Sequence, residues 1–440
     1  MQDNQRNHQK AEWGNKTIIE EADFCGWKAV YLRNDLVTLV AVPDIGGRIM
    51  AYDLGDYPFL FVDPNLAGKL FSPDENAGDG SLAAWKNYGG DKTWPSPQGW
   101  DNENQWHGPP DPVLDTGRYS LVNFGSTGRE AFIEMTSPPD LRTGIQITRK
   151  ATIYSGSTRV VLDLIFKNIS DRAVRWSIWD VVQLRSDKEL ADGTRTFEPE
   201  CVVTTPLNKN SRFPNSYNVM FGEERNPQWQ INSEEGLFVA QYQWEIGKVG
   251  IDSSAGWIAF SNNASGFVFA EQFTHFSGAE YPDEGVSVEC WTVGKGVAAN
   301  LDYEHSGIYL METEVLSPLF DIQPGESRSF RIEWGVCRCP GPVLDVQAGG
   351  CIGRRLNISD ESGKTKLNGA FGVFEPGELI LNWEAAGGTP LKQESIGRVS
   401  PLEAVILDEQ VERVDRAIKI KLTVKAEVDG SFRDLAEIDI

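Results

Sequence analysis

The sequence predicts an all-β fold, and three observations support this. Apolar alternation with β-branched and aromatic residues recurs along the whole chain. No segment of comparable length shows helical periodicity. Glycine (43 residues) and proline (23 residues) interrupt the alternating segments at short intervals, as turns between antiparallel strands do, so we expect a sandwich or barrel. The strands most clearly indicated are 37–42, 144–154, 158–166, 237–243, 266–273, 286–292 and 327–336.

Composition and charge narrow the class of protein. The chain has 440 residues, of which 40% are hydrophobic and 24% charged, so it can bury at least one full core. Its formal net charge of −23 opposes binding to nucleic acid or to an anionic membrane. The N-terminus is polar, without the apolar core of a signal peptide, and no stretch approaches the ~18 apolar residues of a membrane span. We therefore expect a soluble, cytoplasmic protein with no nucleic-acid or membrane partner.

The common cofactor and metal motifs are missing from the sequence. It contains no GxGxxG, P-loop, GxSxG or HExxH pattern. The four histidines include no pair at metal-ligand spacing, and the six cysteines include no CxxC. We therefore expect no cofactor, no metal and buried free thiols.

Residues 63–117 form a long segment without credible periodicity. The segment contains seven prolines, and a structureless stretch of this length in a compact protein is usually functional or disordered. Four tryptophans argue against disorder, because they supply anchoring area. We expect an ordered, proline-stiffened loop laid over the sheet. The tryptophans are Trp85, Trp94, Trp100 and Trp106.

The composition changes again near residues 339–342. Thirteen of the fourteen tryptophans precede this point, and only Trp383 follows it. Strands are indicated beyond it at 378–383 and 417–428. The sequence thus predicts two domains, a large β domain at 1–340 and a small β-sandwich at 341–440.

Aromatic residues that stand beside charged and amide side chains indicate a carbohydrate site. A pyranose has an apolar face of C–H groups and a rim of hydroxyls, so its binder needs a flat aromatic surface beside hydrogen-bonding groups. Residues 87–98 supply both. The alternative is that these tryptophans only anchor the loop. The candidates in this segment are Asp91, Lys92, Trp94 and Gln98.

Segment 308–315 is a second candidate. If it is a strand, Glu312 and Glu314 point to the same side, since side chains two residues apart share a face. Two neighbouring carboxylates are one way to tune a general base. The alternative is a half-solvated strand whose glutamates face water.

Two more candidates lie on or near other predicted strands. His275 follows strand 266–273, where loops build sites, and is the best candidate proton donor. The alternative for His275 is a packed structural residue beside two phenylalanines. Gln183, in segment 176–183, can reach a ligand or act as a buried structural amide.

Four stretches follow one another in a characteristic order: Gly46-Gly47-Arg48-Ile49, GGDKTWPSPQ at 89–98 with its continuation through Trp106 to Asp115, YPDEGVSVE at 281–289 and METEVLSPLFDIQPGES at 311–327. Together they resemble galactose mutarotase-like proteins and, more narrowly, a bacterial family of uncharacterised function in that superfamily. The resemblance covers about residues 15–338. It implies a β-supersandwich whose concave face binds carbohydrate, with the small C-terminal β-sandwich outside it.

The resemblance also implies a chemistry. Aldose 1-epimerases of this superfamily use a glutamate base on a strand reading roughly LETQ, ahead of a Pro-Gly-Glu turn, and this match points to Glu312. Their acid is a histidine on an earlier strand, but the 176–184 strand here has none. His275 or His107 is then the expected acid.

The implied activity is that of an aldose 1-epimerase-like isomerase acting at the anomeric centre of a sugar. In this interpretation Arg48 and Lys92 hold hydroxyls, and Trp94 and Trp106 stack on the ring. The alternative is a non-catalytic carbohydrate-binding module or an accessory domain for a polysaccharide-degrading enzyme.

Overall fold

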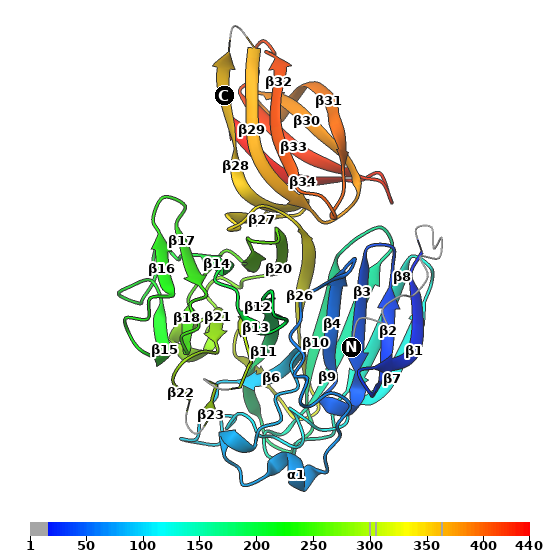
Figure 1. Ribbon diagram of the computed structural model, residues 1–440, viewed down its shortest axis with the longest axis vertical. Helices are drawn as coiled ribbons and strands as arrows, with labels where there is room; N and C mark the ends of the chain where they lie inside the picture. Colours follow the sequence, from blue (N-terminus) through cyan, green and yellow to red (C-terminus); the bar gives the residue numbers. More distant parts are fainter. Residues whose placement is uncertain (1–15, 299–300, 304–305, 362–363) are drawn as a thin grey trace.

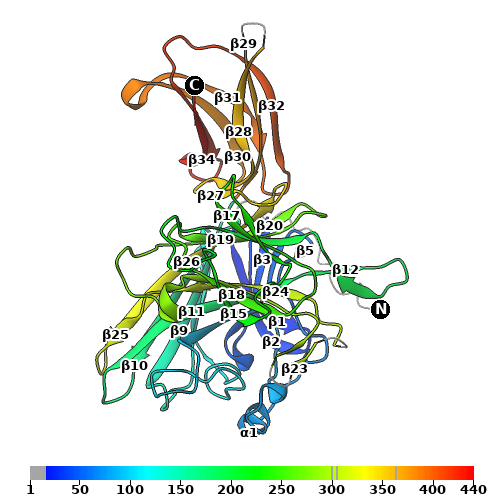
Figure 2. The ribbon, with the colours of Figure 1, turned by 90° about the vertical axis from the view of Figure 1, so that its left-hand side faces the viewer.

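The computed structural model describes residues 16–298, 301–303, 306–361 and 364–440. Within these ranges the protein is built almost entirely of β-strands, so the predicted all-β class is confirmed. Two large antiparallel sheets pack together, and two smaller sheets lie beyond one end of them (Figures 1 and 2). No helix in the described ranges is long and apolar enough to cross a membrane.

The larger sheet carries the candidate site. Its main path joins strands that are far apart in sequence, because β6 and β11 stand between the N-terminal strands and β24. In path order it contains β1 (Ile18–Phe24), β2 (Trp27–Arg33), β3 (Val37–Val42), β4 (Arg48–Leu54), β6 (Asp91–Ser96), β11 (Val174–Arg185), β24 (Leu310–Leu316), β21 (Val288–Thr292), β18 (Gly247–Ile251) and β15 (Asn218–Gly222), with β5 (Tyr57–Pro58) and β25 (Phe320–Ile322) at its sides.

The second sheet packs against one face of the first. The main hydrophobic core lies between them and includes Leu39 and Val182 from the first sheet and Ile147 and Leu162 from the second. The second sheet contains, in order, β16 (Trp229–Asn232), β17 (Leu237–Gln241), β14 (Cys201–Pro206), β19 (Trp257–Asn262), β20 (Phe267–Phe273), β26 (Ser327–Arg338), β10 (Val160–Asn168), β9 (Ile145–Tyr154), β8 (Glu130–Thr136) and β7 (Ser120–Ser126).

Short elements decorate the loops. Two small hairpins pair β12 (Asp187–Glu189) with β13 (Arg195–Phe197) and β22 (Val297–Ala298) with β23 (Leu301–Asp302). The helical segments are α1 (Pro73–Ala77), α2 (Pro282–Gly285), η1 (Pro43–Ile45), η2 (Leu82–Ala84) and η3 (Ala386–Gly388).

One central strand lies where the sequence predicts only a loop. β6 falls inside the 63–117 segment and pairs with β11 from Asp91 to Ser96, whereas its pairing with β4 is limited to Asp91 opposite Ile49. Pro95 hides this strand, because proline cannot donate to a sheet ladder. The sheet tolerates Pro95 because β6 forms almost no hydrogen-bonded ladder with β4. The rest of the segment consists of loops and the short elements α1 and η2.

The C-terminal part forms two further four-stranded sheets with their own apolar cluster around Trp383. In both views these sheets stand at the end of the molecule opposite α1 (Figures 1 and 2). One sheet contains β27 (Asp345–Gln347), β28 (Gly350–Glu361), β29 (Lys364–Val373) and β32 (Val405–Glu412), and the other contains β31 (Thr389–Val399), β30 (Gly377–Ala385), β33 (Lys419–Ala426) and β34 (Phe432–Asp439).

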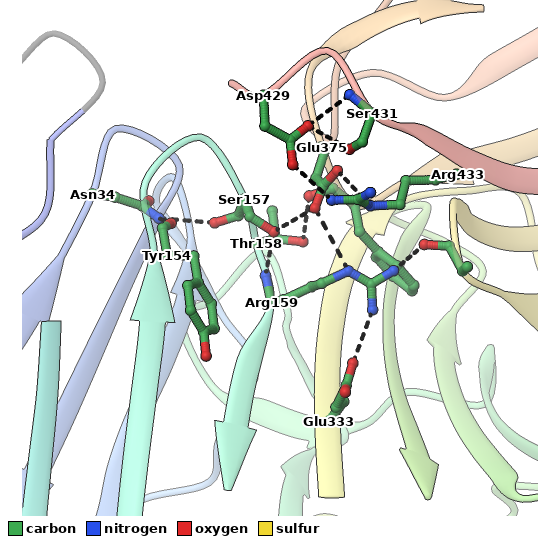
Figure 3. A network of polar contacts seen from close by, with 12 residues as sticks. Asn34, Tyr154, Ser157, Thr158, Arg159, Glu333, Glu375, Asp429, Ser431 and Arg433 are labelled. Carbon is green, nitrogen blue, oxygen red and sulfur yellow. Dashed lines mark hydrogen bonds and ion pairs between the residues drawn. The ribbon is translucent and has the colours of Figure 1, made fainter. Parts of the chain in front are cut away.

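The C-terminal sheets contact the main body directly. Phe374 packs on Gly335 of β26, where an added Cβ would lie 2.7 Å from the ring. Glu375 is approached by Arg159 of the main body at 3.8 Å and by Arg433 of the C-terminal part at 3.3 Å (Figure 3). The junction therefore combines an apolar contact with an ion-pair network.

Candidate functional site

Alternation along the central strands divides their side chains between two faces. On β6, Asp91 and Thr93 point toward the second sheet, whereas Lys92 and Trp94 point away from it, since Asp91 binds Arg149 of that sheet. Cross-strand register brings the other members of the outer face into line. The members are Lys92, Trp94 and Ser96 of β6, Trp179 and Gln183 of β11, Glu312 and Glu314 of β24, Glu289 and Trp291 of β21, and Lys248 of β18.

A cavity of about 310 Å³ opens on this outer face. Six of its seventeen lining residues are aromatic, and the charged groups on its walls are Lys248, Asp283, Glu289 and Glu312. Three carboxyls against one lysine disfavour an anionic ligand. The other lining residues are Leu82, Trp85, Asn87, Trp94, Ser96, Gln98, Pro109, Trp179, Gln183, Met220, Phe221, Trp291 and Tyr303.

Glu312 is held in place by two neighbouring strands. Its Oε1 accepts hydrogen bonds from Lys92 Nζ of β6 at 3.1 Å and from Gln183 Nε2 of β11 at 2.5 Å. Burial lowers the pKa of Lys92 below its usual value, and the charge of Glu312 opposes that change. The ammonium also lies 4.9 Å from the ring centre of Trp94. Glu312 thus presents a positioned carboxylate to the cavity.

A second charged cluster surrounds Lys248. Its Nζ lies 2.6 Å from Glu289 Oε2 and 3.0 Å from Glu314 Oε2, and Trp179 Nε1 donates to the same Glu314 oxygen at 2.8 Å. Burial favours the neutral amine, but the two carboxylates outweigh it and raise the pKa of Lys248. Burial raises the pKa of Glu289 well above its usual value, and the nearby Glu314 adds to this.

Asp283 closes another side of the cavity from the turn that holds α2. Its nearest described hydrogen-bond partner is Ser96 Oγ at 3.5 Å. Its backbone is left-handed, with φ 50°, a conformation that costs energy in a residue other than glycine. Burial raises the pKa of this carboxyl, and the charge of Lys248 opposes the rise.

Beneath the floor of the cavity lies a second polar layer, facing the other sheet. Arg149 binds Asp91 and lies 3.8 Å from Asp180, and Thr93 Oγ1 donates to Asp180 at 2.9 Å. Burial raises the pKa of both aspartates, and Arg149 opposes this. This layer fixes β6, β9 and β11 relative to one another.

The structure brings some of the predicted residues together. Trp94, Gln98, Gln183 and Glu312 line the cavity, and Lys92 supports Glu312 from behind. Glu314 does share the face of Glu312, as predicted, but it is fully buried beneath Lys248.

Other predicted binding residues are structural in this fold. Arg48 and Asp91 are fully buried and do not line the cavity; Arg48 binds Asp115, and Asp91 binds Arg149. Trp106 is 0% exposed, and its Nε1 donates to Asp111 at 2.7 Å. The sequence shows their residue types but not which side of the loop faces a ligand.

Neither histidine proposed as the acid lines the cavity. His275 stacks on Tyr281, with ring centres 5.0 Å apart, and burial lowers its pKa. His107 stacks on Trp100 at 4.5 Å. Tyr281 precedes Asp283 by two residues, so His275 supports the turn that carries Asp283.

Sequence reasoning missed the residues that join the cavity from separate strands. Lys248, Glu289 and Asp283 were not candidates, because β18, β21 and the α2 turn that carry them are far from β6 in the sequence. The YPDEGVSVE stretch contains two of them, Asp283 and Glu289, and was the sequence signal that could have identified them. In the described ranges, no three histidine, cysteine or carboxylate side chains are grouped to hold a metal ion.

Fold and site together define an all-β protein with an aromatic, carboxylate-lined cavity on its larger sheet. The chain belongs to the family described as Domain of unknown function (DUF4380), whose model matches residues 28–337. Membership of an uncharacterised family is thus confirmed. No curated protein matches the sequence.

Solved structures with a similar arrangement share little sequence with this chain. The Slr1438 protein from Synechocystis is 13% identical with a TM-score of 0.43, over 72% of this chain and 99% of that one. A galactose mutarotase-like protein from Clostridium acetobutylicum is 10% identical with a TM-score of 0.44, over 74% and 100%. Another galactose mutarotase-like protein, from Lactobacillus casei, is 9% identical with a TM-score of 0.43, over 70% and 99%.

Proposed function

We propose that the cavity binds a neutral sugar and that the protein interconverts its anomers, with Glu312 as the general base. The observation that carries the proposal is the Glu312 carboxylate, held by Lys92 and Gln183 on the floor of an aromatic cavity. A base at the anomeric hydroxyl needs such a fixed carboxylate within hydrogen-bond reach of the ligand.

The shape and polarity of the walls fit a sugar. Trp94, Trp179 and Trp291 supply apolar area for the C–H face of a pyranose. Two buried polar atoms in the wall, Trp94 Nε1 and Gln183 Oε1, have no hydrogen-bond partner among the described residues. One is a donor and the other an acceptor, as the hydroxyl rim of a sugar requires.

The reaction would proceed by ring opening and closing. Glu312 takes the proton from the C1 hydroxyl, the bond between C1 and the ring oxygen breaks, and an acid protonates the ring oxygen. The resulting aldehyde turns about the C1–C2 bond. Ring closure on its other face, with both protons returned, gives the opposite anomer, so no atom or electron is gained or lost.

A second candidate is a carbohydrate-binding protein without catalysis. The observation that favours it is the position of His275 and His107, neither of which lines the cavity. In that case the cavity binds sugar but lacks a histidine acid.

A panel of neutral reducing sugars tests the proposal. Titration calorimetry identifies which sugars bind, and polarimetry on a freshly dissolved pure anomer gives the rate of interconversion. We expect at least one sugar to bind and to equilibrate faster than in buffer alone. Binding without acceleration would support the second candidate, and no binding to any sugar would contradict both.

A further inference from the structure

We propose that Asp283 is the acid that protonates the ring oxygen, in the same cavity that Glu312 lines. The inference rests on the proposed epimerase function and supplies the group that the sequence leaves open, because both expected histidines lie off the cavity. Asp283 can fill this role without any cofactor, since a carboxylic acid donates a proton directly.

The pairing of the carboxyl groups singles out Asp283. Glu312 lies 3.1 Å from Lys92 Nζ, and Glu289 and Glu314 lie within 3.0 Å of Lys248 Nζ. Each of these three is therefore held as part of an ion pair. Among the described residues, no lysine, arginine or histidine nitrogen forms an ion pair with Asp283, whose printed hydrogen-bond partner is the neutral Ser96.

The surroundings of the two carboxyls differ. Glu312 accepts hydrogen bonds from a lysine and from an amide, so its oxygen is held in place. Burial raises the pKa of Asp283, and the positive charge of Lys248 opposes this rise; the carboxyl of Glu289 is the other charged group that interacts with Asp283. A carboxyl fixed by donors suits a base, and a half-buried carboxyl without an ion-pair partner suits an acid.

Asp283 also has the access that an acid needs. Glu289 is 1% exposed and Glu314 is 0% exposed, and both are engaged by Lys248, whereas Asp283 is only half-buried and lines the cavity. The left-handed backbone at Asp283 and Glu284 turns the chain sharply, and Tyr281, stacked on His275, anchors the turn. The strain is the kind that rigid functional turns hold.

In the proposed step the neutral Asp283 gives its proton to the ring oxygen while Glu312 accepts the C1 hydroxyl proton, and the bond between C1 and the ring oxygen breaks. On ring closure, Asp283 takes the proton back from the attacking hydroxyl, which becomes the ring oxygen. Glu312 returns its proton to the carbonyl oxygen. Both side chains regain their starting states.

The test compares Asp283→Asn and Asp283→Gly with the wild type in the polarimetric assay over a range of pH. Asn and Gly both accept a left-handed backbone, so either variant serves if the other folds poorly. We expect a loss of about 10² to 10⁴-fold in rate, sugar affinity within about tenfold, and no fall in the remaining rate at alkaline pH. Acetate buffer should partly restore Asp283→Gly.

Two further variants keep the outcomes distinct. Glu284→Gln, at the exposed and equally left-handed neighbour, should keep the wild-type rate. The assignment would be overturned if Asp283→Asn kept both the wild-type rate and the wild-type fall in rate at alkaline pH. It would also be overturned if only Glu289→Gln lost that fall. A wild type no faster than buffer would instead overturn the proposed function, and the role of Asp283 with it.

Discussion

Lys92 and Glu312 form an ion pair between two central strands, 3.1 Å apart and separated by 220 residues of sequence. The pair places a cation directly behind the carboxylate that faces the cavity. This contact joins segment 63–117 to β24, and it positions the carboxylate that the proposed chemistry requires.

Replacing Lys92 should therefore slow the reaction by releasing the base from its position. Lys92→Met keeps the length of the side chain but removes the hydrogen bond and the ion pair to Glu312. We expect the polarimetric rate to fall by about tenfold or more, because a displaced catalytic group loses rate steeply. Lys86→Met, in the same loop, is the control and should keep the wild-type rate. A wild-type rate in Lys92→Met would argue against this role.

Trp94 and Trp106 should respond differently to truncation. Trp94 lines the cavity, whereas Trp106 is fully buried and hydrogen-bonded to Asp111. We expect Trp106→Ala to lower the free energy of unfolding by about 3–5 kcal/mol, and Trp94→Ala to weaken sugar binding by tenfold or more. Denaturant unfolding and calorimetry on both variants check this. Equal loss of affinity in the two would contradict the assignment of Trp106 to structure.

Much of the fold could be predicted from local sequence. The predicted strand 37–42 is β3, and the predicted strands 144–154 and 266–273 match β9 and β20 to within one residue. Alternation and turn residues determine such strands locally. β6 could not be found in this way, because Pro95 interrupts its pattern and its pairing with β11 is a long-range contact.

The site was predictable only in part, for a related reason. Glu312 and Gln183 were recognisable by residue type and position on a strand. Their meeting with Lys248 and Asp283 depends on sheet order, which joins β24 to β21 and β18. Sequence also shows that Asp91 and Lys92 are adjacent, but only the pairing of β6 reveals that they face opposite sides of the sheet.

The buried network around Arg149 should control stability in a pH-dependent way. Arg149→Met leaves Asp91 and Asp180 without their cation, and breaking a buried pair typically costs about 3–5 kcal/mol. Burial raises the pKa of both aspartates, so the folded state keeps protons that the unfolded chain releases. The stability of the variant should therefore fall as pH rises above ~4, where unfolded aspartates ionise.

Urea unfolding of Arg149→Met at pH 5 and pH 8 measures this effect. Arg331→Met, at an exposed pair with Asp163, is the control and should cost less than about 1 kcal/mol at either pH. An Arg149→Met variant that is as stable at pH 8 as at pH 5 would contradict this prediction, because the charges of Asp91 and Asp180 would then be balanced by groups other than Arg149.

Removal of the C-terminal sheets should leave a folded main body of lower stability. The main core lies between the two large sheets and does not include residues beyond Val336, but Phe374 and Val346 share a smaller cluster with Trp257 and Val268. A chain ending at Pro340 should therefore keep a cooperative melt at a reduced temperature. Insoluble or molten material would show that the two parts share one folding unit.

The Glu312→Gln substitution tests the central claim most directly. Glutamine keeps the size and most hydrogen bonding of Glu312 but cannot accept the proton from the C1 hydroxyl. Polarimetry should show that anomer interconversion falls to the spontaneous rate, while calorimetry shows sugar affinity within about tenfold, or ~1.4 kcal/mol, of the wild type. Glu314→Gln, buried beneath Lys248, should lose less activity. A wild-type rate in Glu312→Gln would contradict the proposal that Glu312 is the base.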